Sequence, residues 1–186
     1  MGDDHNFRGI ILVRKDSPIQ TVLELKGKTI SFPAKSALAA TMMPQRFLYD
    51  NGLDIIHDIN SLYVGSQESS IMNTYLHHSD ASATWPSPWA SFQKERPEVA
   101  KELKVIWETS SLINNGLVTK QSIDSSFINV IAELFVNLYT TEEGRTLLDA
   151  MQLKRFEKAD NTTYEPIKKF LNKFDTEVRP IKLYHE

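Results

Sequence analysis

Residues 28–40 read Lys-Thr-Ile-Ser-Phe-Pro-Ala-Lys-Ser-Ala-Leu-Ala-Ala, and this stretch decides the fold class. The apolar and β-branched residues within 28–32 predict a buried strand, which the following proline ends. Ser36 is of a residue type that caps helices, so we expect a helix from there to about Asp50, with a kink at Pro44. A strand, a short loop and a helix in this order form the repeating unit of an α/β protein.

The same order of strand and helix continues on both sides of this stretch. Short helices are expected from Ser17-Pro18 and over residues 67–77. The predicted strands are residues 9–14, 62–64, 81–85 and 103–107, with one more around Leu117-Val118. This alternation predicts a mainly parallel sheet with helices on both faces. Ligands of such sheets bind at the carboxyl ends of the strands.

The pattern changes after about residue 110, where strands give way to consecutive helices. Apolar side chains from Phe127 to Leu138 recur every three or four residues, which predicts an amphipathic helix. Two more helices are expected, over about 142–151 and 164–174. The sequence therefore predicts an α/β unit followed by a mainly helical one.

The composition excludes several classes of protein. The chain has 186 residues and a net charge of -3, from 24 acidic and 21 basic side chains, which argues against nucleic acid as a partner. It has no cysteine, so disulfides, thiol catalysis and cysteine-bound zinc are excluded. No apolar run approaches the length of a membrane helix, and the polar, acidic first residues do not resemble a signal peptide.

Two junctions between a strand and a helix could bind an anion. One is residues 32–40, which contains Ser36, and the other is residues 64–70, which contains Ser66. Each would place a hydroxyl group and unpaired backbone N–H groups at a helix start, where the helix dipole favours negative charge. Simple capping of the two helices also explains both serines, and because capping is so common, the residues alone favour it over anion binding.

The segment Ala83-Thr84-Trp85-Pro86-Ser87-Pro88-Trp89 predicts a stiff aromatic loop directly after a strand. Its aromatic rings could line a pocket or pack into the core, and the sequence leaves both open. The chain has no phosphate loop, no dinucleotide fingerprint and no nucleophile paired with a base, so we expect no enzyme activity. His77-His78 has no second cluster at a metal-binding spacing, so neither a metal nor another cofactor is expected.

An ordered set of short motifs resembles a known family. The set consists of Phe7-Arg8-Gly9, Arg14-Lys15-Asp16-Ser17, Leu25-Lys26-Gly27-Lys28, Val64-Gly65-Ser66, Asp80-Ala81, Ala83-Thr84-Trp85 and Val105-Ile106-Trp107. In order and spacing, these motifs resemble the phosphonate/phosphate/phosphite-binding proteins of ABC transporters, which have the type II periplasmic binding protein fold. The resemblance extends from about Phe7 to Phe174.

The resemblance implies two α/β lobes that crossing strands join, with the ligand held in the cleft between them. Residues 1–15 would hold a crossing strand and a remnant of the first lobe, 16–110 the complete ligand-binding lobe, and 111–186 the return crossing and the helical part of the first lobe. A typical member has a further stretch before the position of Phe7, so the first lobe would be incomplete here. The C-terminal helices would then expose apolar faces, and we expect self-association.

The resemblance also implies where a small phosphorus oxyanion binds. The helix start that holds the anion in the family matches Ser36, Ala37, Leu38 and Ala39. We expect Ser66, Gln67, Glu68, Thr84, Trp85 and Asn115 to complete the site. Family members often have a histidine at the position of Gln67 and an acid near Asn114-Asn115, and these departures argue against an aminoalkyl-phosphonate ligand.

The implied function is ligand binding for transport. The chain would act as the substrate-binding component of an ABC transporter for phosphonate, phosphate or phosphite, and would deliver its ligand to an ABC permease. It would then be periplasmic or anchored to the outer side of a membrane. The alternative is a ligand-sensing domain of a signalling protein that is built on the same fold.

Overall fold

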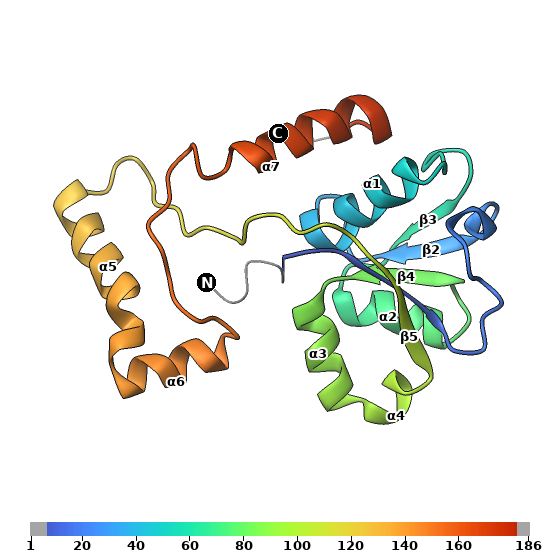
Figure 1. Cartoon of the computed structure of the whole chain (residues 1–186), viewed down its shortest axis with the longest axis horizontal. Helices are drawn as coiled ribbons and strands as arrows, with labels where there is room; N and C mark the ends of the chain where they lie inside the picture. The colour runs from blue at the N-terminus through green and yellow to red at the C-terminus, as the bar shows by residue number, and fades with distance from the viewer. Residues whose placement is uncertain (1–6, 182–186) are drawn as a thin grey trace.

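The sheet is built from five strands in the order β3-β2-β4-β1-β5 (Figure 1). The computed structural model describes residues 7–181. The strands are β1 (Ile10–Arg14), β2 (Thr29–Phe32), β3 (Asn60–Tyr63), β4 (Ala81–Thr84) and β5 (Leu103–Glu108). β2 pairs in parallel with β3 and with β4, whereas β1 pairs antiparallel with β4 and with β5. Four strands therefore run in one direction, and the predicted mainly parallel sheet is confirmed.

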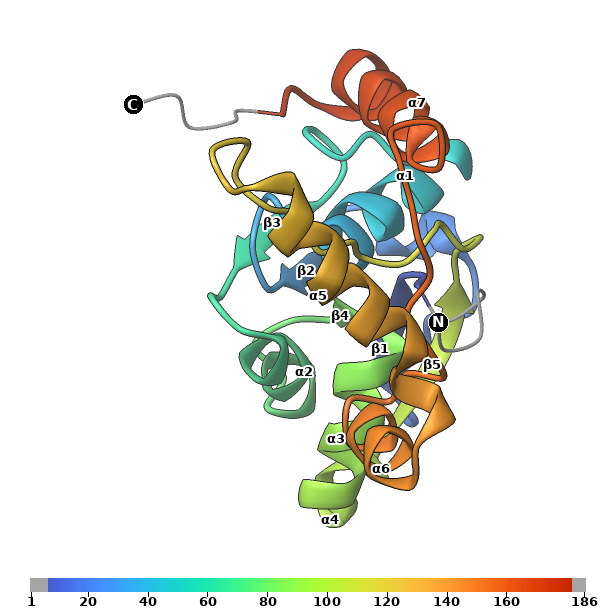
Figure 2. The same ribbon diagram turned by 90° about the vertical axis from the view of Figure 1, so that its left-hand side faces the viewer.

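Helices connect the strands and cover both faces of the sheet (Figures 1 and 2). A π-helical turn, η2 (Leu38–Met42), leads directly into α1 (Met43–Asp50) on one face. The elements toward the other face are α2 (Gln67–Tyr75), α3 (Pro86–Glu95) and α4 (Pro97–Ala100). The predicted kink at Pro44 corresponds to the change from π-helix to α-helix. Pro44 lies in the first turn of α1, and because it has no N–H group it cannot donate a hydrogen bond to the π-helical turn before it.

The inner strand β1, which lies between β4 and β5, supplies apolar side chains to two separate cores. Ile11 and Val13 belong to the cluster under α1, whereas Ile10 and Leu12 belong to the cluster under α2 and α3. All four side chains are at most 2% exposed. Successive residues of a strand point to opposite faces, so a continuous apolar run is what a strand covered on both sides requires.

Buried hydroxyl groups fix α2 on the sheet. The Ser70 hydroxyl lies within hydrogen-bonding distance of the carbonyls of Ser31 and Ala83, at 2.9 Å from each. The Ser31 hydroxyl in turn donates to the Ser70 carbonyl at 2.7 Å. These small side chains bring the helix close to β2 and β4, so the start of α2 is held at the end of the sheet.

The C-terminal part of the chain is helical and adds no strand within residues 7–181. It contains α5 (Ser125–Asn137), the 3-10 turn η3 (Leu138–Thr140), α6 (Glu142–Ala150), α7 (Glu165–Lys173) and the π-helical turn η4 (Phe174–Val178). Figure 1 shows α5 and α6 standing apart from the sheet, with two extended segments leading to and from them. The predicted change from an α/β to a helical pattern therefore occurs after β5.

The last helix returns to the lobe. Phe174 is 0% exposed and Val178 is 5% exposed, and both belong to the core cluster that contains Phe32 and Leu48. Figure 1 accordingly shows α7 lying beside α1. The C-terminal segment is therefore not wholly separate from the α/β lobe, because two apolar side chains of η4 pack into the core on the face of the sheet that α1 covers.

Two predicted elements are wrong. Leu117 and Val118 form no strand: they lie in an extended segment and are 70% and 92% exposed, because no neighbouring strand is present to pair with them within the described part of the chain. The helix expected from Ser17-Pro18 is replaced by a 3-10 turn, η1 (Val22–Leu25). That turn begins later because the Glu24 carboxylate accepts hydrogen bonds from the N–H groups of Gln20 and Thr21.

The buried position of Phe174 gives a testable prediction. Phe174→Ala should lower the free energy of unfolding by about 3–5 kcal/mol, because it removes a fully buried aromatic ring and leaves a cavity. Phe127→Ala is the matched control, since Phe127 is 60% exposed and its truncation should change stability by less than about 0.5 kcal/mol. Urea unfolding at low protein concentration measures both. Equal losses would contradict the packing of η4 in the core.

Candidate functional site

Three strand–helix junctions lie at one edge of the sheet. β3, β2 and β4 are neighbours and run in parallel, so their carboxyl ends share that edge, and each strand is followed by a helix. Backbone hydrogen bonds join the first two junctions: the Val64 N–H donates to the Phe32 carbonyl at 3.0 Å, and the Gly65 N–H donates to the Pro33 carbonyl at 2.8 Å. Gly65 has a φ of +86°, which favours glycine at this turn.

The first junction presents free backbone donors. The N-cap residue is Ala37, and no side chain caps the helix, so the prediction that Ser36 is the cap is wrong. Ser36 is instead exposed in the turn just before. Within residues 7–181, the N–H groups of Leu38 and Ala39 have no hydrogen-bond acceptor. Such unpaired groups at a helix start suit an anion.

The second junction has its hydroxyl group engaged. The Ser66 hydroxyl accepts a hydrogen bond from the Ser69 N–H at 3.0 Å, so Ser66 is the N-cap of α2. Glu68 forms an ion pair with Arg96, at 2.6 Å, and its negative charge is thereby balanced. Gln67 is linked to the third junction, because its Oε1 accepts a hydrogen bond from the buried hydroxyl of Thr84 at 2.7 Å. The amide nitrogen of Gln67 remains able to donate.

The third junction is not the aromatic loop that we expected. Trp85 is the N-cap of α3, and Pro86, Ser87, Pro88 and Trp89 form its first turn. Two prolines in this turn remove two N–H groups, so this helix start offers fewer donors to an anion than the other two. The half-buried Trp85 ring packs edge-on against Phe7, with 5.9 Å between the ring centroids.

The crossing segments meet the site at the same edge. The Leu112 N–H donates to the Phe7 carbonyl, and the Thr109 N–H donates to the Gly9 carbonyl, both at 2.9 Å. Gly9 has no space for a side chain, since a Cβ atom there would lie 2.7 Å from the Ala39 carbonyl oxygen. Asn115 lies beyond these contacts, with its side chain exposed, and no hydrogen bond joins it to the other expected site residues in the described part of the chain.

Sequence reasoning missed a polar network beside the first junction. Gln45 is 0% exposed; its amide nitrogen donates to the Tyr63 hydroxyl at 3.1 Å, and its amide oxygen accepts from Arg179 Nε at 2.8 Å. The second terminal nitrogen of Arg179 donates to the Lys35 carbonyl at 2.7 Å. No local signal points to this network, because 134 residues separate Gln45 and Arg179 in the sequence.

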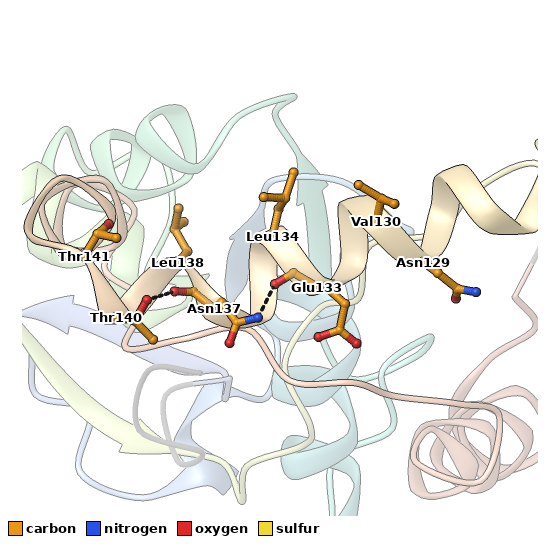
Figure 3. Close-up of a pocket in the computed structure, with 8 residues that line it drawn as sticks. All are labelled: Asn129, Val130, Glu133, Leu134, Asn137, Leu138, Thr140 and Thr141. Carbon is orange, nitrogen blue, oxygen red and sulfur yellow. Dashed lines mark hydrogen bonds between the residues drawn. The ribbon is translucent and has the colours of Figure 1, made fainter.

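A hollow lies away from this edge, along α5. It has a volume of about 570 Å³, and its lining runs from Asn129 to Thr141. Figure 3 shows Val130, Leu134 and Leu138 pointing to the same side of the helix. Val130 and Leu134 are 59% and 63% exposed, as expected for a helix whose apolar face has no partner. The hollow has few groups that could hold an oxyanion, so the sheet edge remains the candidate site.

Other kinds of site find no support in residues 7–181. This part of the chain contains no group of three or more histidine or acidic side chains that could hold a metal ion. None of its helices is both long enough and apolar enough to cross a membrane.

Comparison with known proteins identifies the family. Residues 2–164 match the family of ABC transporter, phosphonate, periplasmic substrate-binding proteins. The chain belongs to this family. Its members are binding proteins of transporters and not enzymes, as expected from the absence of catalytic motifs.

The relatives are longer than this chain. A probable ABC transporter phosphite-binding protein, PhnD1, from Prochlorococcus marinus is 22% identical over 92% of the chain, which spans 62% of that relative. The phosphonates-binding periplasmic protein of Escherichia coli is 21% identical over 87% of the chain, which spans 49% of it. The chain thus spans about half to two thirds of the length of these relatives.

Solved structures confirm the fold. PhnD1 of P. marinus in complex with methylphosphonate superposes with a TM-score of 0.80 at 22% identity, over 94% of this chain and 70% of that one. A binding protein component of an ABC phosphonate transporter from Pseudomonas aeruginosa also gives a TM-score of 0.80, at 20% identity, over 95% of this chain and 61% of that one. The α/β fold of the periplasmic-binding-protein type is therefore confirmed.

The two serines at the site should differ in their effect on stability. Ser66→Ala should lower the free energy of unfolding by about 1 kcal/mol, because the hydroxyl caps α2. Ser36→Ala, the control, should change it by less than about 0.5 kcal/mol, since its exposed side chain caps no helix. Thermal and urea unfolding of the two variants measure the difference. A larger loss for Ser36→Ala would show that its hydroxyl has a structural role.

The exposed face of α5 should cause the chain to self-associate. Apolar patches of this kind promote association, so light scattering should give a mean mass above that of a monomer. Leu134→Lys should return the chain to a monomer, whereas Asn129→Lys, on the polar side of the same helix, should not (Figure 3). A monomeric parent chain at high concentration would contradict this expectation.

Proposed function

We propose that residues 16–110 form the lobe that binds a small phosphorus oxyanion (phosphonate, phosphate or phosphite) for an ABC transporter. Residues 1–15 and 111–186 then hold the crossing segments and the helical part of the other lobe. The observation that carries this proposal is the pair of adjacent helix starts at one sheet edge, in a chain of the phosphonate-binding family. The methylphosphonate complex of PhnD1, which shares the fold, supports the ligand class.

The free donors fit a tetrahedral anion. Backbone N–H groups of Leu38 and Ala39 would bind two oxygens of the anion, and the second helix start would approach from the adjacent junction. Gln67 would donate from its amide nitrogen, because its oxygen is already occupied by Thr84. Ser36 and Ser66 would lie at the rim, with Trp85 as an apolar wall against an alkyl group. Asn115 lies in the extended segment after β5, so its side chain would approach the anion from that segment.

The charges near the site also favour an anion. Glu68 is paired with Arg96, so its carboxylate does not face the site as an isolated charge. Lys35 and Arg179, by contrast, form no ion pair with a carboxylate within residues 7–181; Lys35 Nζ lies 5.3 Å from the centre of the Tyr63 ring. Two cations without acidic partners give the first junction a local positive potential, although the net charge of the chain is -3.

The remaining parts of the proposal follow from the family. The protein would act outside the cytoplasmic membrane, either free in the periplasm or anchored to the membrane, and would pass its ligand to an ABC permease. No nucleic acid and no cofactor take part.

Calorimetric titration tests the proposed ligand. Methylphosphonate, phosphite and phosphate should each be tried against sulfate, and we expect at least one phosphorus oxyanion to bind. Ser36→Trp should abolish that binding, because the indole ring would cover the first helix start. Ser122→Trp places the same side chain on an exposed serine outside the lobe and should bind as the parent does. Unchanged affinity in Ser36→Trp would place the site elsewhere.

A further inference from the structure

The C-terminal turn η4 is attached to the lobe by two arginines that differ in what they contact. Arg46, on α1, forms ion pairs with Asp50, at 2.8 Å, and with Glu177 of η4. Arg179, just after η4, contacts no carboxylate in the described residues and instead bridges the Gln45 side chain and the Lys35 carbonyl. Of these two arginines, Arg179 is the one that connects the C-terminal segment to the loop between β2 and η2.

The geometry of the Arg179 contacts is well defined. Its guanidinium lies over the Phe174 ring, 5.0 Å from the ring centre, and Phe174 is fixed by complete burial. Its acceptor Gln45 is also fully buried and is fixed from the other side by Tyr63, the last residue of β3. A planar guanidinium with separate donors can hold both oxygens at once, whereas an ammonium group on a flexible chain cannot reproduce this fork.

The bridge ends at the carbonyl that precedes the candidate anion site. Lys35 is two residues before the N-cap Ala37, after which the free N–H groups of Leu38 and Ala39 follow. The N–H groups of Leu38 and Ala39 belong to the second and third peptides after the one that carries the Lys35 carbonyl, so a shift of the loop at Lys35 would move the helix start that they belong to. We infer that Arg179 is a positioning residue, which holds the loop 33–36 so that the helix start presents its N–H groups to the anion. The expected effect of Arg179 on anion binding rests on the proposed function, whereas its expected effect on the loop does not.

A matched pair of variants separates this role from simple attachment of the C-terminal segment. Arg179→Lys and Arg46→Lys make the same change at two arginines that both hold η4, and only the first touches the loop. In the anion-free chain, we expect Arg179→Lys to shift the amide NMR signals of residues 36–39, whereas Arg46→Lys should leave them in place. Signals that stay in place in Arg179→Lys, or that move equally in both variants, would overturn the inference.

Binding gives the second readout. Arg179→Lys should weaken methylphosphonate binding by about tenfold, and Arg46→Lys by less than about twofold, as measured by calorimetry. Full affinity in Arg179→Lys would mean that charge alone is sufficient, and would overturn the positioning role. A parent chain that binds none of the oxyanions would contradict the proposed function, while the NMR comparison would still decide whether Arg179 sets the loop.

Discussion

The parallel pairing of β2 with both of its neighbours is the constraint on which the site depends. Parallel strands end at the same edge of a sheet, so the chain must leave β3, β2 and β4 at one place and continue into three helices there. Hydrogen bonds from residues 64 and 65 to residues 32 and 33 extend this pairing beyond the strands. Two helix starts are thus brought together at one edge of the sheet, and the first of them has unpaired N–H groups.

The interior of the lobe maintains this arrangement from both faces of the sheet. Under α2, small hydroxyl-bearing side chains such as Ser31 and Ser70 satisfy backbone carbonyls and allow close packing. Under α1, larger side chains dominate, and Phe174 from the end of the chain completes the cluster. A shift of either helix would break buried contacts, so both helix starts are fixed by packing that lies well inside the lobe.

Most of the α/β order could be predicted from sequence, because strand and helix periodicities are local properties. The start of α3 at Pro86 could also have been predicted, because proline is common in the first turn of a helix. The two tryptophans and two prolines of this segment were instead interpreted as an aromatic loop. The strand expected at Leu117-Val118 could not be judged locally, because an extended segment becomes a strand only if a partner is present. The Gln45–Arg179 bridge depends on tertiary packing alone.

The return of η4 to the lobe has a consequence for how the chain folds. Contacts between residues as distant as Gln45 and Arg179 close a very long loop, and such non-local contacts slow folding. During synthesis, the strands and helices up to residue 108 would emerge before Phe174, so the part of the core that Phe174 and Val178 fill would stay open until these residues had been made. Until then the nascent lobe would expose the apolar side chains around that gap, and exposed apolar surface of this kind favours chaperone binding.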